Sequence, residues 1–187
     1  MGSVEAPISS RKALPPLLSP TPTPREAIAD TLARFCMGMD TNDVELFDSA
    51  FTADAFWDLS GKKVSGLENI HKECYFHNIV KLDTTHMVSN LRIDISPSGN
   101  AAQLTCLFVA WHWPLGTGMH VDSHRFTSGG NYFFDVVKDG SSGLWKFTRF
   151  AMTKQWSEGD IAVMGHKKPT EMLKVEMNST APVGETS

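Results

Sequence analysis

The sequence predicts an α+β fold: a curved, mostly antiparallel sheet wrapped by three helices into a cone with an internal pocket. Apolar residues recur at helical spacing early in the chain, and strand-like segments bounded by turn clusters fill its second half. Strands joined by hairpins pair antiparallel, and the helices must then cover one face of the sheet. A chain of 187 residues can bury the core that one such domain needs.

Both ends of the chain are expected to lie outside this domain. Residues 1–24 are rich in proline, serine and threonine, which predicts a disordered arm. The tail 165–187 is polar, although a short helix over 170–177 could fold over the pocket mouth as a lid. The cone itself is expected to be formed by residues 25–164.

The first helix has a clear start signal. Thr23 can accept hydrogen bonds from free backbone N–H groups, Pro24 suits the first helical position, and Glu26 places an acid in the first turn. Apolar spacing then predicts a helix as far as a turn at 40–42 and a second, short helix around 44–47.

After these helices the spacing of apolar residues along the sequence changes from a helical to a strand-like pattern. A first strand over 53–59 is expected to turn at 60–63 into a short strand ending at Ser65, and 66–82 is predicted to be a third helix. Clusters of Gly, Pro, Asn and Ser, which favour turn conformations, then separate longer strand-like segments. These segments are 84–95, 101–113, 122–138 and 144–157, and a last helical turn is expected at 160–164.

Composition and charge narrow the range of partners. The formal net charge is −4 and no dense run of lysine or arginine occurs, so we expect no nucleic-acid partner. No apolar stretch approaches the roughly 20 residues that span a bilayer, and the start lacks the apolar region of a secretory signal. Three widely spaced cysteines suit a reducing compartment, so we expect a cytoplasmic protein with no membrane partner. No glycine-rich phosphate loop or dinucleotide fingerprint is present, so no cofactor is expected.

Several short strings, taken in order, carry a family resemblance. They are Met39-Asp40, Glu45-Leu46-Phe47, Phe51-Thr52-Ala53-Asp54-Ala55, Thr85-His86, Leu144-Trp145-Lys146-Phe147 and Trp156-Ser157-Glu158-Gly159. The chain thereby resembles the SnoaL-like branch of the nuclear-transport-factor-2-like superfamily, and within it the scytalone dehydratase group. The resemblance implies a cone-shaped pocket and acid–base catalysis, although many members of the superfamily only bind ligands or partners.

The resemblance places Asp40 and His86 on the positions of a catalytic pair, in which an Asp at a helix end orients a His that moves protons. The chemistry is sound in itself: a carboxylate that accepts from one imidazole nitrogen fixes the tautomer and makes the other nitrogen more basic. The alternative is that Asp40 caps a turn and His86 lies on the surface at a strand end.

His112 and Asn131 resemble a second histidine and an asparagine that line the dehydratase pocket. In a strand over 101–113, Phe108 and His112 share one face, which gives an apolar wall with a polar end. His112 could then donate a proton to a leaving hydroxyl, and Asn131 could hold a substrate oxygen. The alternative is that His112 only bonds to backbone at the strand end.

The chain also departs from the dehydratase pattern. Two tyrosines polarise the substrate carbonyl in that group, whereas Met39 and the Phe56-Trp57-Asp58 segment occupy the corresponding places here. Scytalone is therefore not the expected substrate. Met39, Trp57 and Phe108 indicate a more apolar and adaptable cavity. Asp58 could add a second carboxylate if the strand register points it inward.

One competing pattern is a metal site. His120, Asp122 and His124 would share a face if they lay in a strand, as in a site with two histidines and one carboxylate. Strand alternation would then place His124 opposite to Asn131, so both sets cannot face the pocket without a bulge. We therefore expect no metal.

These observations predict a cofactor-independent acid–base lyase or isomerase, acting by dehydration, cyclisation or rearrangement on an apolar polycyclic natural-product intermediate. Asp40, His86 and His112 are the candidate catalytic residues; Asn131, Trp57, Asp58, Met39 and Phe108 are the candidate substrate contacts. The alternative is a ligand-binding or dimeric interaction module without catalysis. In either case outward apolar side chains on the strands favour a homodimer.

Overall fold

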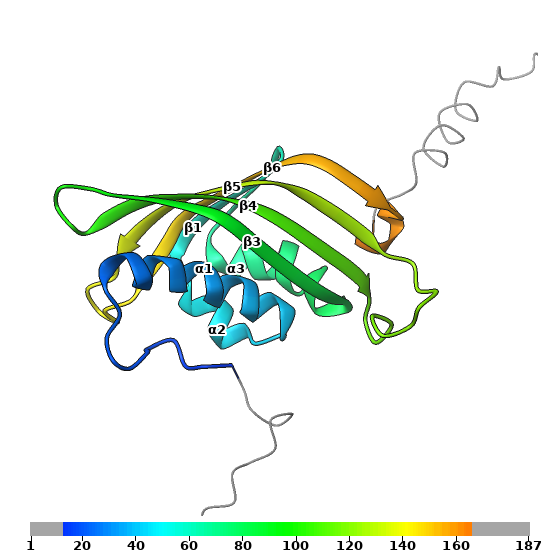
Figure 1. Cartoon of the computed structure of the whole chain (residues 1–187), viewed down its shortest axis with the longest axis horizontal. Coiled ribbons are helices and arrows are strands. Elements are labelled where there is room, and N and C mark those ends of the chain that lie inside the picture. Colours follow the sequence, from blue (N-terminus) through cyan, green and yellow to red (C-terminus); the bar gives the residue numbers. More distant parts are fainter. Residues whose placement is uncertain (1–12, 166–187) are drawn as a thin grey trace, which may run out of the picture.

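The computed structural model describes residues 13–165, which form one sheet with helices on a single face (Figure 1). The strand order is β2-β1-β6-β5-β4-β3, and the sheet arches over the helical layer. This arrangement confirms the predicted α+β class. The helices are α1 (Pro24–Asp40), α2 (Val44–Ser49) and α3 (Leu67–Ile70), and the strands are β1 (Phe51–Leu59), β2 (Lys62–Ser65), β3 (Leu82–Ile95), β4 (Ala101–Pro114), β5 (Phe126–Lys138) and β6 (Trp145–Gly159).

Helix α1 begins where its start signal predicts. The Thr23 side chain accepts from the backbone N–H of Glu26, and the Glu26 carboxylate accepts from the backbone N–H of Thr23, which together form a capping box. Pro24 occupies the first turn, where its missing N–H has no helical partner to lose. The helix buries one face against the sheet and ends at Asp40, so its last residue reaches the candidate site.

A close backbone contact joins α1 to α2. A Cβ on Gly38 would lie 2.6 Å from the backbone nitrogen of Phe47, so only glycine fits at this crossing. The hydroxyl of Tyr75 donates to the Gly38 carbonyl oxygen at 3.0 Å and covers the crossing from the other side. The contact fixes the end of α1, and with it Asp40, against the rest of the helical layer.

Arg34 is a buried cation that links three elements. Its guanidinium pairs with Asp30 at 3.0 Å within α1, donates to Ser49 in α2 and donates to the Trp145 carbonyl oxygen of β6 at 2.8 Å. A buried charge is tolerated when its donors are satisfied in this way. The network holds the helical layer to the sheet at the end away from Asp40.

The sheet is antiparallel except that β1 runs parallel to β6. Register shifts interrupt β3 between Ser89 and Arg92, and the β5–β6 pair between Gly129 and Gly130. Such bulges bend strands and increase their twist, which accounts for the arch of the sheet. In β6 the shift leaves Gln155 unpaired, because Gly130 pairs with Lys154 while Gly129 pairs with Trp156.

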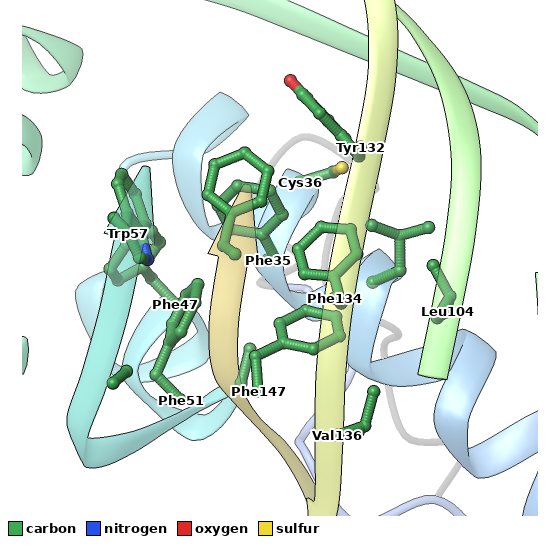
Figure 2. Packing of buried hydrophobic residues seen from close by; sticks show 14 of the residues in the cluster. Phe35, Cys36, Phe47, Phe51, Trp57, Leu104, Tyr132, Phe134, Val136 and Phe147 are labelled. Atoms are coloured by element: carbon green, nitrogen blue, oxygen red, sulfur yellow. The ribbon is translucent and has the colours of Figure 1, made fainter. Parts of the chain in front are cut away.

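An aromatic cluster fills the space between α1 and the sheet (Figure 2). Phe35 lies at its centre, with edge-on contacts to rings from β1, β5 and β6. Phe134 stacks on Phe147 and on Phe150, with centroid separations of 4.0 and 4.9 Å. Edge-on and offset stacks add to the free energy gained from burying the rings, and they make this end of the cone rigid.

Two predicted elements differ from the structure. The segment 66–82 is not one helix: α3 passes into a π-helical turn over His71–Tyr75, and a 3-10 turn follows at Ile79–Lys81. Cys74 and Tyr75 are the buried residues of the π turn. The strand predicted from residue 122 begins only at Phe126.

The other long strands begin and end within two residues of the prediction, and the last helical turn is the 3-10 turn Ile161–Met164. The three cysteines are free and buried. No helix in the 13–165 range is long and apolar enough to cross a membrane. The predicted lid helix over 170–177 lies outside the described residues.

Candidate active site

A cavity of about 370 Å³ lies between the inner face of the sheet and the helical layer. Its volume falls within the usual range for sites that bind small molecules. Met39 from α1, Trp57 from β1 and Phe108 from β4 line it, as predicted, together with Phe35 and Phe150. These side chains make most of the wall apolar, and the polar groups described next interrupt it at a few defined places.

Asp40 and His86 meet at the edge of this cavity. The imidazole Nδ1 of His86 lies 2.6 Å from Asp40 Oδ1, and the backbone N–H of His86 donates to Oδ2 at 2.8 Å. Thr84 Oγ1 adds a third donor to the carboxylate, also at 2.8 Å. The side chain of His86 is 5% exposed and that of Asp40 is 16% exposed, so the pair is largely shielded from water.

These contacts set the charge and the tautomer of the pair. Burial raises the pKa of Asp40, but the hydrogen bond and charge of His86, with the other donors, outweigh it and leave this pKa below its ordinary value. An ionised Asp40 can only accept, so Nδ1 of His86 carries a proton. Because His86 lines the cavity, its Nε2 is the nitrogen that can exchange a proton with a ligand.

His112 lies beside His86 on the neighbouring strand. The two rings are perpendicular with centroids 5.7 Å apart, and both line the cavity. Burial, reinforced by the nearby charge of His86, lowers the pKa of His112 to about 4, so this imidazole is neutral at physiological pH. Its Nδ1 faces the Phe126 carbonyl oxygen at 3.2 Å and must be the protonated nitrogen. Nε2 therefore offers a lone pair that can accept a hydrogen bond, whereas the proton donation predicted from the sequence needs a protonated ring, which the lowered pKa of His112 disfavours.

Asn131 does not line the cavity. On β5 the buried inward positions Tyr132, Phe134 and Val136 have even numbers, and Asn131 pairs with Leu107 and Thr153 on the opposite face. Alternation along the strand excludes it from the pocket, contrary to prediction. Strand alternation, counted from these buried even-numbered positions, predicts which β5 residues line the cavity.

Those residues are Ser128 and Tyr132 from β5, with Lys154 from β6, and sequence reasoning missed all three. Ser128 is 5% exposed and Tyr132 3% exposed. Neither hydroxyl has a hydrogen-bond partner within residues 13–165, and both oxygens stay accessible from the cavity. Figure 2 shows the phenol oxygen of Tyr132 pointing away from the aromatic cluster.

Asp58 does not line the cavity and instead stabilises a turn. Its carboxylate accepts from the backbone N–H of Gly61 at 2.8 Å and so stabilises the turn between β1 and β2. Trp57, the adjacent residue, faces the cavity, so alternation turns Asp58 away.

The residues of the competing metal pattern lie in the turns before β5, and His120, Asp122 and His124 are all exposed. They are not in a strand, so the alternation that would align them does not apply. Across residues 13–165 no three His, Cys, Asp or Glu side chains are arranged to hold a metal ion.

The amino-acid sequence was compared with protein-family models and with known proteins. A model of the SnoaL-like domain matches residues 22–151. Terrestric acid biosynthesis cluster protein E of Penicillium crustosum is 40% identical over 153 residues, which cover 82% of this chain and 97% of the relative.

Solved structures share the fold at lower identity. A scytalone dehydratase candidate from Novosphingobium aromaticivorans superposes with a TM-score of 0.63 at 22% identity, over 77% of this chain and 89% of that one. Hexachlorocyclohexane dehydrochlorinase LinA-type3 from Novosphingobium barchaimii gives 0.58 at 17% identity, over 78% and 94% of the two chains. At these identities the likeness concerns the fold alone.

Proposed function

Because the chain belongs to the SnoaL-like domain family, we propose that it is a cofactor-independent acid–base lyase or isomerase acting on a small, largely apolar metabolite. The observation that carries the proposal is the Asp40–His86 pair, shielded from water and open to an apolar cavity. The relative from a biosynthesis cluster supports a natural-product intermediate as the substrate.

In the proposed reaction His86 Nε2 takes a proton from an acidic C–H or O–H of the substrate. The carboxylate of Asp40 stabilises the imidazolium that forms and keeps the ring in place. His86 then returns the proton to a second position of the same molecule, which gives isomerisation or cyclisation, or to a leaving hydroxyl, which departs as water. A positioned acid–base group of this kind contributes roughly 10²–10⁴-fold to the rate.

The surrounding residues would orient the substrate and keep water out. His112, neutral and with a free Nε2, can accept a hydrogen bond from a substrate hydroxyl. Met39, Trp57 and Phe108 supply apolar walls, of which methionine is the most adaptable in shape. Holding a flexible molecule with its reacting atoms aligned lowers the barrier further.

A ligand carrier on the same scaffold is the second candidate, because a cavity of about 370 Å³ with apolar walls suffices for binding. The two candidates differ in what Asp40 and His86 must do. A carrier needs no ionised carboxylate behind an imidazole, whereas a lyase or isomerase does.

The test is turnover, in D₂O, of intermediates that accumulate in a producing strain from which the gene for this protein has been deleted. The product is examined by NMR, since isomerisation leaves the mass unchanged. The proposal expects a changed skeleton or a lost hydroxyl, together with deuterium at the carbon that His86 protonates. Binding of the intermediates without any chemical change would support the carrier and refute the enzyme.

A further inference from the structure

We propose that the cavity recognises an organic acid: an ionised carboxylate of the substrate binds Lys154 while Ser128 and Tyr132 donate hydrogen bonds to its oxygens. These three residues are called the donor wall below. The inference deepens the proposed function and rests on it, since it names the class of substrate that the same cavity would accept.

The first support is that Ser128 and Tyr132 line the cavity from one strand, and that their hydroxyls have no hydrogen-bond partner within residues 13–165. Both oxygens stay accessible from the cavity, since the fully enclosed side-chain atoms without a partner in the described residues are Trp57 Nε1 and Thr127 Oγ1, so a ligand oxygen can reach both hydroxyls. Burial raises the pKa of Tyr132 well above its ordinary value, so the phenol remains a donor. Phe108 stacks on its ring at 4.0 Å and Phe150 meets it edge-on at 4.9 Å, which fixes where the hydroxyl lies.

The second support is the position of Lys154. On β6 the alternate residues Phe150, Met152 and Lys154 all line the cavity. The ammonium lies 5.7 Å from the centroid of the Phe126 ring, a contact that holds it over the cavity wall. Its charge also contributes, as the smallest of the causes, to the lowered pKa of His112.

The third support is the balance of charge around the cavity. Lys62 also lines it but already pairs with Glu73 at 3.7 Å. Lys154 has no ion-pair partner in the described part of the chain. Lys154 is exposed and so keeps its charge in water, which leaves its ammonium available to pair with a substrate anion at the cavity, while the two neutral donors could bond the remaining lone pairs of a carboxylate.

The two histidines and the donor wall lie on different strands of the cavity. The proton acceptors His86 and His112 come from β3 and β4, and the donors come from β5 and β6. In the sheet register His86 pairs with Ala110 and Ala110 pairs with Ser128, so the backbones of His86 and Ser128 lie two strand spacings, roughly 10 Å, apart, and Lys154 lies one strand further on β6. One small molecule can therefore place an acid group on the donor wall and its reacting atom at His86.

The test uses 2-naphthoate and methyl 2-naphthoate, which share an aromatic body and differ in the charge. Each is titrated by NMR into the full-length protein, into Lys154→Met and into the control Lys63→Met, which removes an exposed lysine outside the cavity. We expect the acid to bind the wild type more tightly than the ester. We expect Lys154→Met to weaken binding of the acid about tenfold while binding of the ester changes less than twofold.

Further variants separate charge from shape. Lys154→Arg should restore most of the affinity for the acid, and Tyr132→Phe should weaken binding of the acid about threefold with little effect on the ester. Equal binding of acid and ester to the wild type, no binding of the acid, or an unchanged acid affinity in Lys154→Met would overturn the inference. Binding is measured without turnover. If the protein binds the acid more tightly than the ester but converts no substrate, the proposed enzymatic activity is refuted and the inference about the carboxylate stands.

Discussion

The carboxylate of Asp40 holds His86 at two points, since Oδ1 accepts from the imidazole Nδ1–H and Oδ2 accepts from the backbone N–H of the same residue. The last residue of α1 thus fixes both the ring and the strand that carries it. Neither contact can shift without the other, so the direction of Nε2 into the cavity is set by the docking of a helix end on a sheet.

We expect Asp40→Asn and His86→Ala each to reduce turnover by about 10²–10⁴-fold, because the first variant loses the charge that stabilises the imidazolium and the second loses the base. Because both residues also join the end of α1 to β3, turnover is compared at a temperature at which circular dichroism shows each variant folded. Asp48→Asn is the matched control, since Asp48 forms an equally short contact with His71, at 2.6 Å, outside the cavity. Normal turnover by both active-site variants would contradict the proposed proton transfer by Asp40 and His86.

The buried His112 makes stability depend on pH. Its pKa falls from 6.5 to about 4 in the folded protein, so the unfolded chain binds more protons between these values. The free energy of unfolding should therefore be highest above pH 6.5 and decline as the pH falls toward 4, by up to about 3 kcal/mol from this residue.

Urea denaturation at a series of pH values measures this slope. His112→Gln should flatten the decline between pH 6.5 and 4, whereas His77→Gln, at an exposed position, should leave it as in the wild type. An unchanged slope in the first variant would show that His112 is not the residue responsible.

Gly38→Ala should destabilise the fold by about 1–3 kcal/mol or more, because the new methyl group would lie 2.6–2.7 Å from backbone and Cβ atoms of Phe47. Gly140→Ala is the control: its Cβ would meet no atom within 4 Å. Thermal unfolding compares the two. Equal melting temperatures would mean that α1 and α2 can separate without cost.

The outer face of the sheet predicts self-association. Met87, Leu107, Phe133 and Trp156 are all exposed, and Met87, Leu107 and Trp156 line one shallow apolar hollow there. We propose that a second copy of the chain covers this face, and light scattering should report a dimer. Leu107→Glu should give a monomer, whereas Met119→Glu, at an exposed position outside this face, should not. A monomeric wild type at micromolar concentration would contradict the proposal.

Local signals explain which parts of the fold were predictable. The capping box at Thr23 and the turn clusters between long strands act within a few residues, so the sequence alone locates α1 and most of the sheet. The break in 66–82 is different, because it depends on Tyr75 reaching Gly38 on another helix. No local pattern reports that contact.

Part of the site was predictable: family strings indicated Asp40 and His86, and strand alternation indicated that Phe108 and His112 share a face. The structure brings Asp40 and His86 together as the resemblance implied, but Asn131 was placed by alignment rather than by alternation, and its neighbour Tyr132 faces the cavity. The tautomer of His112 could not be foreseen at all, because it depends on the Phe126 carbonyl across a strand pairing.

The unpaired residue in β6 has an effect on both sides of the sheet. Because Gln155 is left out of the ladder, Lys154 points inward while Trp156 lies on the outer face against Gly129, where a Cβ would come within 2.5 Å of the indole. In an uninterrupted strand the indole would share the side of Lys154 and occupy room that a ligand needs. In a homologue without this irregularity, the tryptophan would therefore move from the outer face into the cavity, and the space for a ligand would shrink.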